Sequence, residues 1–150
     1  MSQIRSILLA EDSPADAEMA IDALRDANLV NPIVHVHDGA DCMDFLMARG
    51  NYEGRSGGDP AVLLLDIKMP RMDGLEVLRE MRNHDHLKRL PVVVLTSSRE
   101  ECDLVRSYQL GVNAFVVKPV DFQEFFAAIR DLGMFWAVLN EPPPRIPGGP

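Results

Sequence analysis

The sequence predicts an α/β protein built on a doubly wound, five-stranded parallel sheet with the strand order 2-1-3-4-5. The first observation is an apolar run at residues 62–65 without polar alternation, which is typical of a strand buried on both faces. The second is that five short apolar runs alternate with five stretches of helical character, as strands and their crossover helices do. The third is that polar residues follow the runs, at the edge where open parallel sheets bind ligands.

Five short apolar runs form the expected strands. They lie at residues 4–10, 33–36, 62–65, 92–95 and 114–117. The second run is the weakest, because Val34 and Val36 alternate with histidines. The polar, glycine-rich stretch 50–60 is long for a connection, and we expect it to form a mobile surface loop.

Residues that favour helix starts follow the expected strands. The helices are expected at residues 13–28, 38–50, 74–82, 98–109 and 121–140. Ser13 can cap the first helix, and Pro14 suits its first position. Ser98 and Glu101 have the spacing of a capping box, which predicts the start of the fourth helix. Helices that connect parallel strands cover both faces of a sheet, and this gives the doubly wound arrangement.

Six polar residues end four of the expected strands. They are Glu11, Asp12, Asp66, Thr96, Ser97 and Lys118. The carboxyl ends of parallel strands meet at one edge, where crowded carboxylates repel one another and raise the pKa of at least one of them. Mg²⁺ suits such carboxylates together with a phosphoryl oxygen, and a lysine can pair with the same anion. The pattern predicts a phosphoryl-transfer site in which Asp66 is the nucleophile.

Each of these residues also has a simpler interpretation. Glu11 and Asp12 alone are more typical of a solvated loop than of a metal site. Lys118 alone fits an exposed turn, and Thr96 alone fits a helix cap. Asp66 alone is equally a cap or a surface acid where a strand ends. Their joint placement at the ends of four strands is hard to obtain by chance, and it favours the functional interpretation.

The composition argues against several classes of protein. The formal net charge is −8, whereas a nucleic-acid surface needs a basic stripe. No apolar run is long enough to span a bilayer, and the first residues lack a signal-peptide pattern. Cys42 and Cys102 have no metal-site spacing, so we expect buried or half-buried thiols rather than a disulfide. We expect a single-domain cytoplasmic protein with neither nucleic-acid nor membrane partners.

These residues carry a resemblance to a known family. The acidic pair at 11–12, the stretch DIKMPRMDG at 66–74, Thr96 and the Lys118-Pro119 pair resemble the response-regulator receiver domain of two-component signalling. The resemblance covers nearly the whole chain. It implies a flavodoxin-like fold, and transfer of a phosphoryl group from a sensor histidine kinase to Asp66.

The resemblance also implies roles for single residues. Mg²⁺ would be held by the side chains of Glu11, Asp12 and Asp66 and by the backbone carbonyl of Lys68. Thr96 would contact the phosphoryl group, and Lys118 would pair with it. The Lys118-Pro119 peptide would be cis, which places the Lys118 ammonium over Asp66. Such a protein catalyses only its own phosphoryl transfer and dephosphorylation, so we do not expect an enzyme with an external substrate.

Two positions have open interpretations. Phe115 occupies the place of the aromatic residue that turns inward when receivers are activated, and it is equally interpreted as a fixed core residue. The Lys68 side chain can steer phosphate access, or it can be merely solvated.

Other classes fit the residues less well. An aspartate-nucleophile phosphatase usually has a second acid two residues after the nucleophile, where this chain has Lys68. A flavin-binding sheet needs a phosphate-cradling loop after its first strand, where this chain has two acids. A degenerate receiver, serving only as an interaction module, would lack one of the key residues, and none is missing.

The final helix has more apolar surface than a sheet can cover. Beside one stripe, a second recurs at three-four spacing, with Phe125, Leu132, Phe135 and Leu139. Left in water it would form a large apolar patch, so we expect a homodimer through this helix. The alternative is a helix that ends near Gly133, with the residues after it folded back onto the domain.

The chain is expected to have one domain and a tail. We assign residues 1–140 to the receiver domain and 141–150, rich in proline and glycine, to an extended tail. The loop before Asp66, the long final helix and the absence of an output domain resemble the stand-alone regulators partnered with bacterial phytochromes.

Overall fold

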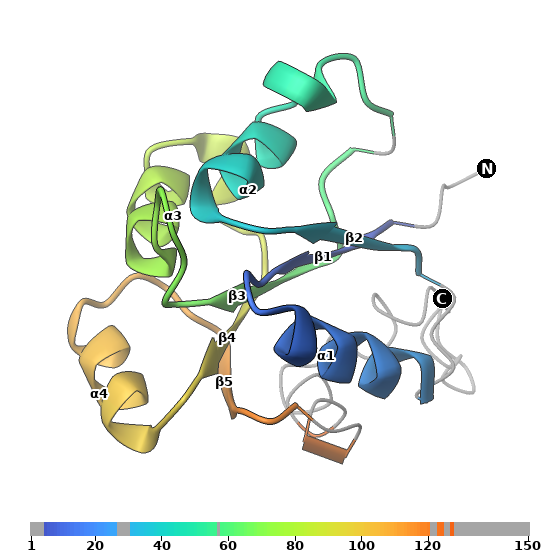
Figure 1. Ribbon diagram of the computed structural model, residues 1–150. Coiled ribbons are helices and arrows are strands. Elements are labelled where there is room, and N and C mark those ends of the chain that lie inside the picture. The colour runs from blue at the N-terminus through green and yellow to red at the C-terminus, as the bar shows by residue number, and fades with distance from the viewer. Residues whose placement is uncertain (1–4, 27–30, 57, 121–122, 125–126, 128–150) are drawn as a thin grey trace, which may run out of the picture.

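The sheet has the predicted strand number, direction and order. The computed structural model describes residues 5–26, 31–56, 58–120, 123–124 and 127. All five strands are parallel, in the order β2-β1-β3-β4-β5 (Figure 1). They are β1 (Ile7–Ala10), β2 (Ile33–Val36), β3 (Val62–Asp66), β4 (Val92–Thr96) and β5 (Ala114–Val117). The chain therefore reverses its winding direction between β1 and β3, where such sheets bind ligands.

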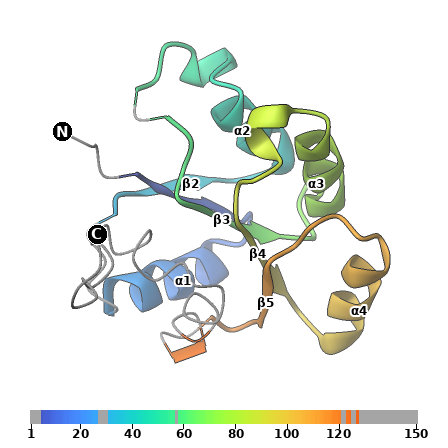
Figure 2. The ribbon, with the colours of Figure 1, turned by 180° about the vertical axis from the view of Figure 1, so that it is seen from behind.

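Helices cover both faces of this sheet. They are α1 (Pro14–Asp26), α2 (Gly39–Leu46), α3 (Gly74–Arg82) and α4 (Arg99–Ser107), with short 3-10 helices η1 (Gly50–Tyr52) and η2 (Asp85–Leu87). Figure 1 and the reverse view in Figure 2 show α1 on one face and α2 and α3 on the other. No helix in the described part of the chain has the length and apolar character needed to cross a bilayer.

The central strands divide their side chains between two cores. In β1, Leu8 and Ala10 pack into the core with α2 and α3, while Ile7 and Leu9 pack into the core with α1. Every residue of β1, β3 and β4 is buried, which is why their sequences are continuously apolar. A fully buried leucine side chain stabilises the fold by roughly 1.5–3 kcal/mol, so a shift of register here is costly.

The starts of the four described helices agree with the predictions, and two helix ends differ. The Ser13 hydroxyl accepts the Asp16 N–H at 3.3 Å and so caps α1. Helix α2 ends at Leu46 rather than Gly50, because Ala48 already has a positive φ of 52°. Helix α4 ends at Ser107 rather than Gln109, where φ is 51°.

The predicted surface loop at 50–60 contains η1 and has specific contacts with α2. The Tyr52 hydroxyl donates to Asp41 at 3.0 Å. Arg55 donates from Nε to the Phe45 carbonyl at 2.6 Å, and its guanidinium lies 4.2 Å from the centre of the Phe45 ring. These contacts fix the part of the loop nearest α2, which glycine content alone did not indicate.

The predictions for the last part of the chain lie mostly outside the described residues. This holds for the helix expected at 121–140, for its second apolar stripe and for the tail at 141–150.

Candidate functional site

The polar residues predicted to gather at the carboxyl edge do so through the strand register. Ala10 pairs with Leu65, so the next residues along β1 and β3, Glu11 and Asp66, lie side by side. The Lys118 N–H donates to the Thr96 carbonyl at 2.7 Å, which continues the β4–β5 pairing to the same edge.

Three carboxylates form an acidic cluster at this edge. Glu11, Asp12 and Asp66 each offer an oxygen, and the three oxygens lie within 4.8 Å of one another. Glu11 and Asp66 are buried, whereas Asp12 is exposed and leaves one side open to solvent. Carboxylate oxygens at this separation, with an open side for water, fit the needs of a hard divalent cation.

The pKa of Asp66 is strongly perturbed. Asp66 is only 3% exposed. Burial and the neighbouring Glu11 carboxylate raise its pKa to about 7, against the opposing effect of the Lys118 ammonium. A raised pKa was expected from the crowding of acids, and burial is its largest cause. A divalent cation would restore the ionised form of this carboxylate at neutral pH.

Lys118 lies among three carboxylates. Its Nζ atom is 2.7 Å from Glu11 Oε1, 3.0 Å from Asp16 Oδ2 and 3.3 Å from Asp66 Oδ1. Burial alone would lower the pKa of Lys118, but the three carboxylates outweigh it and raise this pKa above its ordinary value. The Lys118-Pro119 peptide is cis, as the resemblance implied.

Asp16 was not predicted as a site residue. In the sequence it lies three residues after Ser13, where an acid is typical of a helix start. Helix α1 begins at the carboxyl end of β1, so a carboxylate in its first turn is close to this edge of the sheet. That position is the signal that identifies Asp16 as a neighbour of Lys118.

Thr96 lies at the predicted edge of the sheet, where its hydroxyl contacts a thiol of α4, and the contact expected with a phosphoryl group stays a prediction. Thr96 is fully buried, and its Oγ1 atom lies 3.2 Å from Cys102 Sγ in α4. Among the described residues, its side-chain hydrogen bond is to this thiol rather than to a group of the acidic cluster.

The Lys68 side chain points to α4. Its Nζ atom lies 3.6 Å from Glu101 Oε2, and the Lys68 side chain is 78% exposed. The other Glu101 oxygen accepts the Ser97 N–H at 3.1 Å. The predicted capping box is therefore only half formed: Ser98 accepts from the Glu101 N–H, while the Glu101 side chain binds the turn before it.

The loop after Asp66 is fixed against the start of α2. Arg71 donates to both carboxylate oxygens of Asp38, at 2.8 and 3.0 Å, and this ion pair lowers the pKa of Asp38. Arg71 has a φ of 64°. Gly39 has no room for a side chain, since a Cβ there would lie 1.9 Å from the Met72 carbonyl oxygen. The loop that follows Asp66 is thus held closely against the start of α2.

Phe115 is half-buried and does not belong only to the core. Its ring lies 4.7 Å below the Arg106 guanidinium. It also lines a pocket of about 290 Å³ between α4 and β5, together with Cys102. The ring therefore packs against the core and also borders this pocket.

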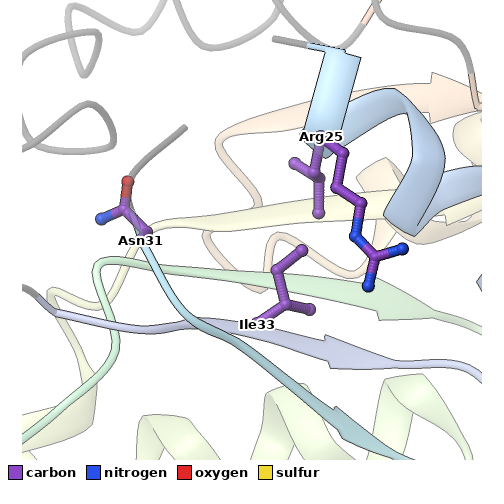
Figure 3. Close-up of a pocket in the computed structure, with 4 residues that line it drawn as sticks. Arg25, Asn31 and Ile33 are labelled. Carbon is purple, nitrogen blue, oxygen red and sulfur yellow. The ribbon is translucent and has the colours of Figure 1, made fainter. Parts of the chain in front are cut away.

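A second pocket, shown in Figure 3, lies at the opposite edge of the sheet. It has a volume of about 300 Å³ and is lined by Leu24 and Arg25 from α1 and by Asn31 and Ile33 near the start of β2. The Asn31 amide donates to the Arg5 carbonyl at 2.9 Å and so ties β2 to β1. Among the described residues that line it there is no carboxylate, so it does not share the chemistry of the acidic cluster.

Comparison with known proteins agrees with this geometry. Residues 7–130 match the family model described as response regulator receiver domain. The chain is 38% identical over 130 residues to response regulator Rcp1 from Synechocystis, covering 87% of both chains. The structure of the bacteriophytochrome response regulator AtBRR is 59% identical, with a TM-score of 0.86, over 93% of this chain and 99% of that one.

A third similarity bears on the acidic cluster. The crystal structure of the Mn²⁺-bound form of Rcp1 is 35% identical to this chain, with a TM-score of 0.72, over 94% of this chain and 99% of that one. Receiver domains bind a divalent metal at an acidic pocket, and the three carboxylates described above form such a pocket here. The sheet order, the acidic edge and the match over residues 7–130 lead to one conclusion. The chain belongs to the response regulator receiver domain family.

Proposed function

We propose that this chain accepts a phosphoryl group on Asp66 from a sensor histidine kinase and relays the signal by binding other proteins. The observation that carries the proposal is the position of Asp66: a buried carboxylate at the end of β3, between two further acids and a lysine ammonium. In the transfer, an Asp66 oxygen attacks phosphorus, the phosphorus–nitrogen bond of the phosphohistidine breaks, and the departing imidazole takes up a proton.

In this proposal the acidic cluster holds Mg²⁺ through Glu11, Asp12, Asp66 and the Lys68 backbone carbonyl. The ion supplies charge neutralisation for the carboxylates and the incoming phosphoryl oxygens. Support comes from the oxygen-only donor set and from the Mn²⁺ bound by the related Rcp1. Magnesium takes such carboxylate and carbonyl ligands together with phosphate.

Two further residues would act on the phosphoryl group itself. The Lys118 ammonium, 3.3 Å from Asp66, would pair with a phosphoryl oxygen. The Thr96 hydroxyl, buried at the end of β4, would donate a hydrogen bond to another. An aspartate-nucleophile phosphatase would usually have a second acid two residues after Asp66, where this chain has Lys68.

We propose that the partner kinase is of the phytochrome type. AtBRR is a bacteriophytochrome response regulator, and the alignment with it covers 99% of its chain. A stand-alone regulator in the cytoplasm fits this similarity and the net charge of −8, which gives no basic surface for nucleic acid.

Labelling with a small phosphodonor tests the proposal. We expect the chain to incorporate one phosphoryl group from acetyl phosphate in the presence of Mg²⁺, with a mass increase measured by intact mass spectrometry. Labelling should be lost with excess chelator and return when Mg²⁺ is added, because the metal offsets the charge of both reactants. Labelling that persists without any divalent cation would contradict the proposed metal requirement.

We also propose a homodimer through the final helix. The support is the second apolar stripe in the sequence, Phe125, Leu132, Phe135 and Leu139, which is best buried by two-fold packing. Light scattering at micromolar concentration should give the mass of two chains. A monomeric mass would contradict the proposal, as would an unchanged dimer after Phe135→Asp combined with Leu139→Asp.

A further inference from the structure

Thr96 and Cys102 form a buried contact between β4 and α4. Thr96 is fully buried and Cys102 is 7% exposed, and the distance from Oγ1 to Sγ is 3.2 Å. Either atom can donate, and in both cases the hydroxyl oxygen is held on the α4 side of the strand. Because Thr96 is fully buried, loss of the thiol removes a partner from a hydroxyl that bulk solvent does not cover.

The start of α4 is itself firmly placed, which fixes the thiol relative to the strand. The Ser98 hydroxyl accepts the Glu101 N–H at 3.2 Å, and the Glu101 carboxylate accepts the Ser97 N–H at 3.1 Å. These two bonds close the turn that joins β4 to α4. Cys102 is therefore held in place independently of Thr96.

The proposed function requires the same hydroxyl elsewhere. To donate to a phosphoryl oxygen on Asp66, the Thr96 hydroxyl must turn its single proton toward the acidic cluster. We infer that Cys102 is a positioning residue. Its thiol holds the Thr96 hydroxyl while Asp66 is unphosphorylated, and this contact breaks when Asp66 carries phosphate. This inference rests on the proposed phosphorylation of Asp66.

The space beside the thiol allows this release. Cys102 lines the pocket of about 290 Å³ that Phe115 and Arg106 also line. When Thr96 leaves, the thiol loses its one hydrogen-bonded neighbour among the described residues and borders this pocket. Loss of the Thr96–Cys102 contact thereby transmits the effect of phosphorylation to the pocket that Cys102 and Phe115 line.

The affinity for a phosphoryl analogue measures the effect of the contact. The probe is beryllofluoride with Mg²⁺, and its apparent dissociation constant is obtained from the rise in unfolding temperature. Cys102→Ala removes a partner that only the unbound state uses. We therefore expect binding about two- to ten-fold tighter, which corresponds to the net free energy of one hydrogen bond. Cys102→Val, which leaves no cavity, should tighten binding similarly. Cys102→Ser restores a donor and acceptor and should return the affinity to that of the parent.

Two controls separate this role from packing. Cys42→Ala removes the other buried thiol, which lies in α2, and it should leave the affinity unchanged. In a Thr96→Val background, Cys102→Ala should have no effect, because the hydroxyl is already absent.

The outcomes distinguish the inference from the function on which it rests. A parent protein that does not bind beryllofluoride contradicts both. A parent that binds it while Cys102→Ala and Cys102→Val bind with parent affinity overturns the inference alone. An equal tightening of beryllofluoride binding by Cys102→Ala in the Thr96→Val background also overturns the inference alone.

Discussion

Asp66→Asn is expected to abolish phosphoryl labelling completely. The amide keeps the size of the carboxylate but has neither its charge nor a nucleophilic oxygen of comparable strength. Substitution also removes one of the three carboxylates of the acidic cluster, so the affinity for Mg²⁺ should fall as well. Intact mass spectrometry after incubation with acetyl phosphate and Mg²⁺ measures the first effect, and calorimetric titration with Mg²⁺ measures the second.

The matched control for this substitution is Asp85→Asn. Asp85 is an aspartate in η2 whose side chain is 96% exposed, and it lies outside the acidic cluster. Asp85→Asn should label at the parent rate. Assignment of the phosphoacceptor to Asp66 is wrong if Asp66→Asn still gains the mass of one phosphoryl group.

Lys118→Ala is expected to cost about 3–5 kcal/mol of unfolding free energy in metal-free protein at pH 8. The reason is that Glu11 and Asp66, whose side chains are 1% and 4% exposed, would lose the only cation that touches both of them in the described structure. Urea unfolding with a chelator present measures this cost. Added Mg²⁺ should recover part of the loss, because it replaces the missing positive charge.

A surface lysine provides the comparison for Lys118. Lys88 lies 3.1 Å from Asp85, but both side chains are well exposed, so Lys88→Ala should cost less than about 1 kcal/mol. Lys118→Ala should still accept phosphate, since Asp66 remains, yet partner binding should no longer respond to it. A loss for Lys118→Ala as small as that for Lys88→Ala would refute the proposed charge balance.

The cost of Lys118→Ala should depend on pH in a defined direction. The pKa of Asp66 is about 7 in the folded protein and 3.8 in the ordinary carboxyl. The folded state therefore retains a proton that the unfolded chain releases, and stability falls as pH rises from about 4 to 7. Without Lys118 this pKa rises further, so the loss should be smaller at pH 5 than at pH 8. An equal loss at both pH values would contradict this explanation.

Much of the fold followed from patterns that are local in the sequence. The run that became β3 has no polar interruption, which predicted a strand buried on both faces, and the alternation in β2 marked it as the weakest of the five. In the structure only Val36 of β2 is buried. The rule that polar residues gather at the carboxyl ends of parallel strands then placed Glu11, Asp66 and Lys118 together.

The contacts that were missed depend on side-chain direction rather than on strand position. The partner of Thr96 is determined by the angle at which α4 leaves β4, which no periodicity reports. The pair between Asp16 and Lys118 joins residues 102 positions apart. The contacts of the loop at 50–60 depend on the Arg55 side chain, whereas the glycine content of this loop indicated only that it would be mobile.

The long sequence separation within the site has a consequence for biosynthesis. Glu11, Asp66 and Lys118 come from the first, third and fifth strands, so the charges are balanced only after the last strand has joined the sheet. Non-local strand pairing is the slow part of assembling such a topology. A chain still emerging from the ribosome has its acids but not their lysine, and it cannot present the complete site. The charge-balanced site is thereby confined to chains in which the fifth strand has joined the sheet and brought Lys118 to the two acids.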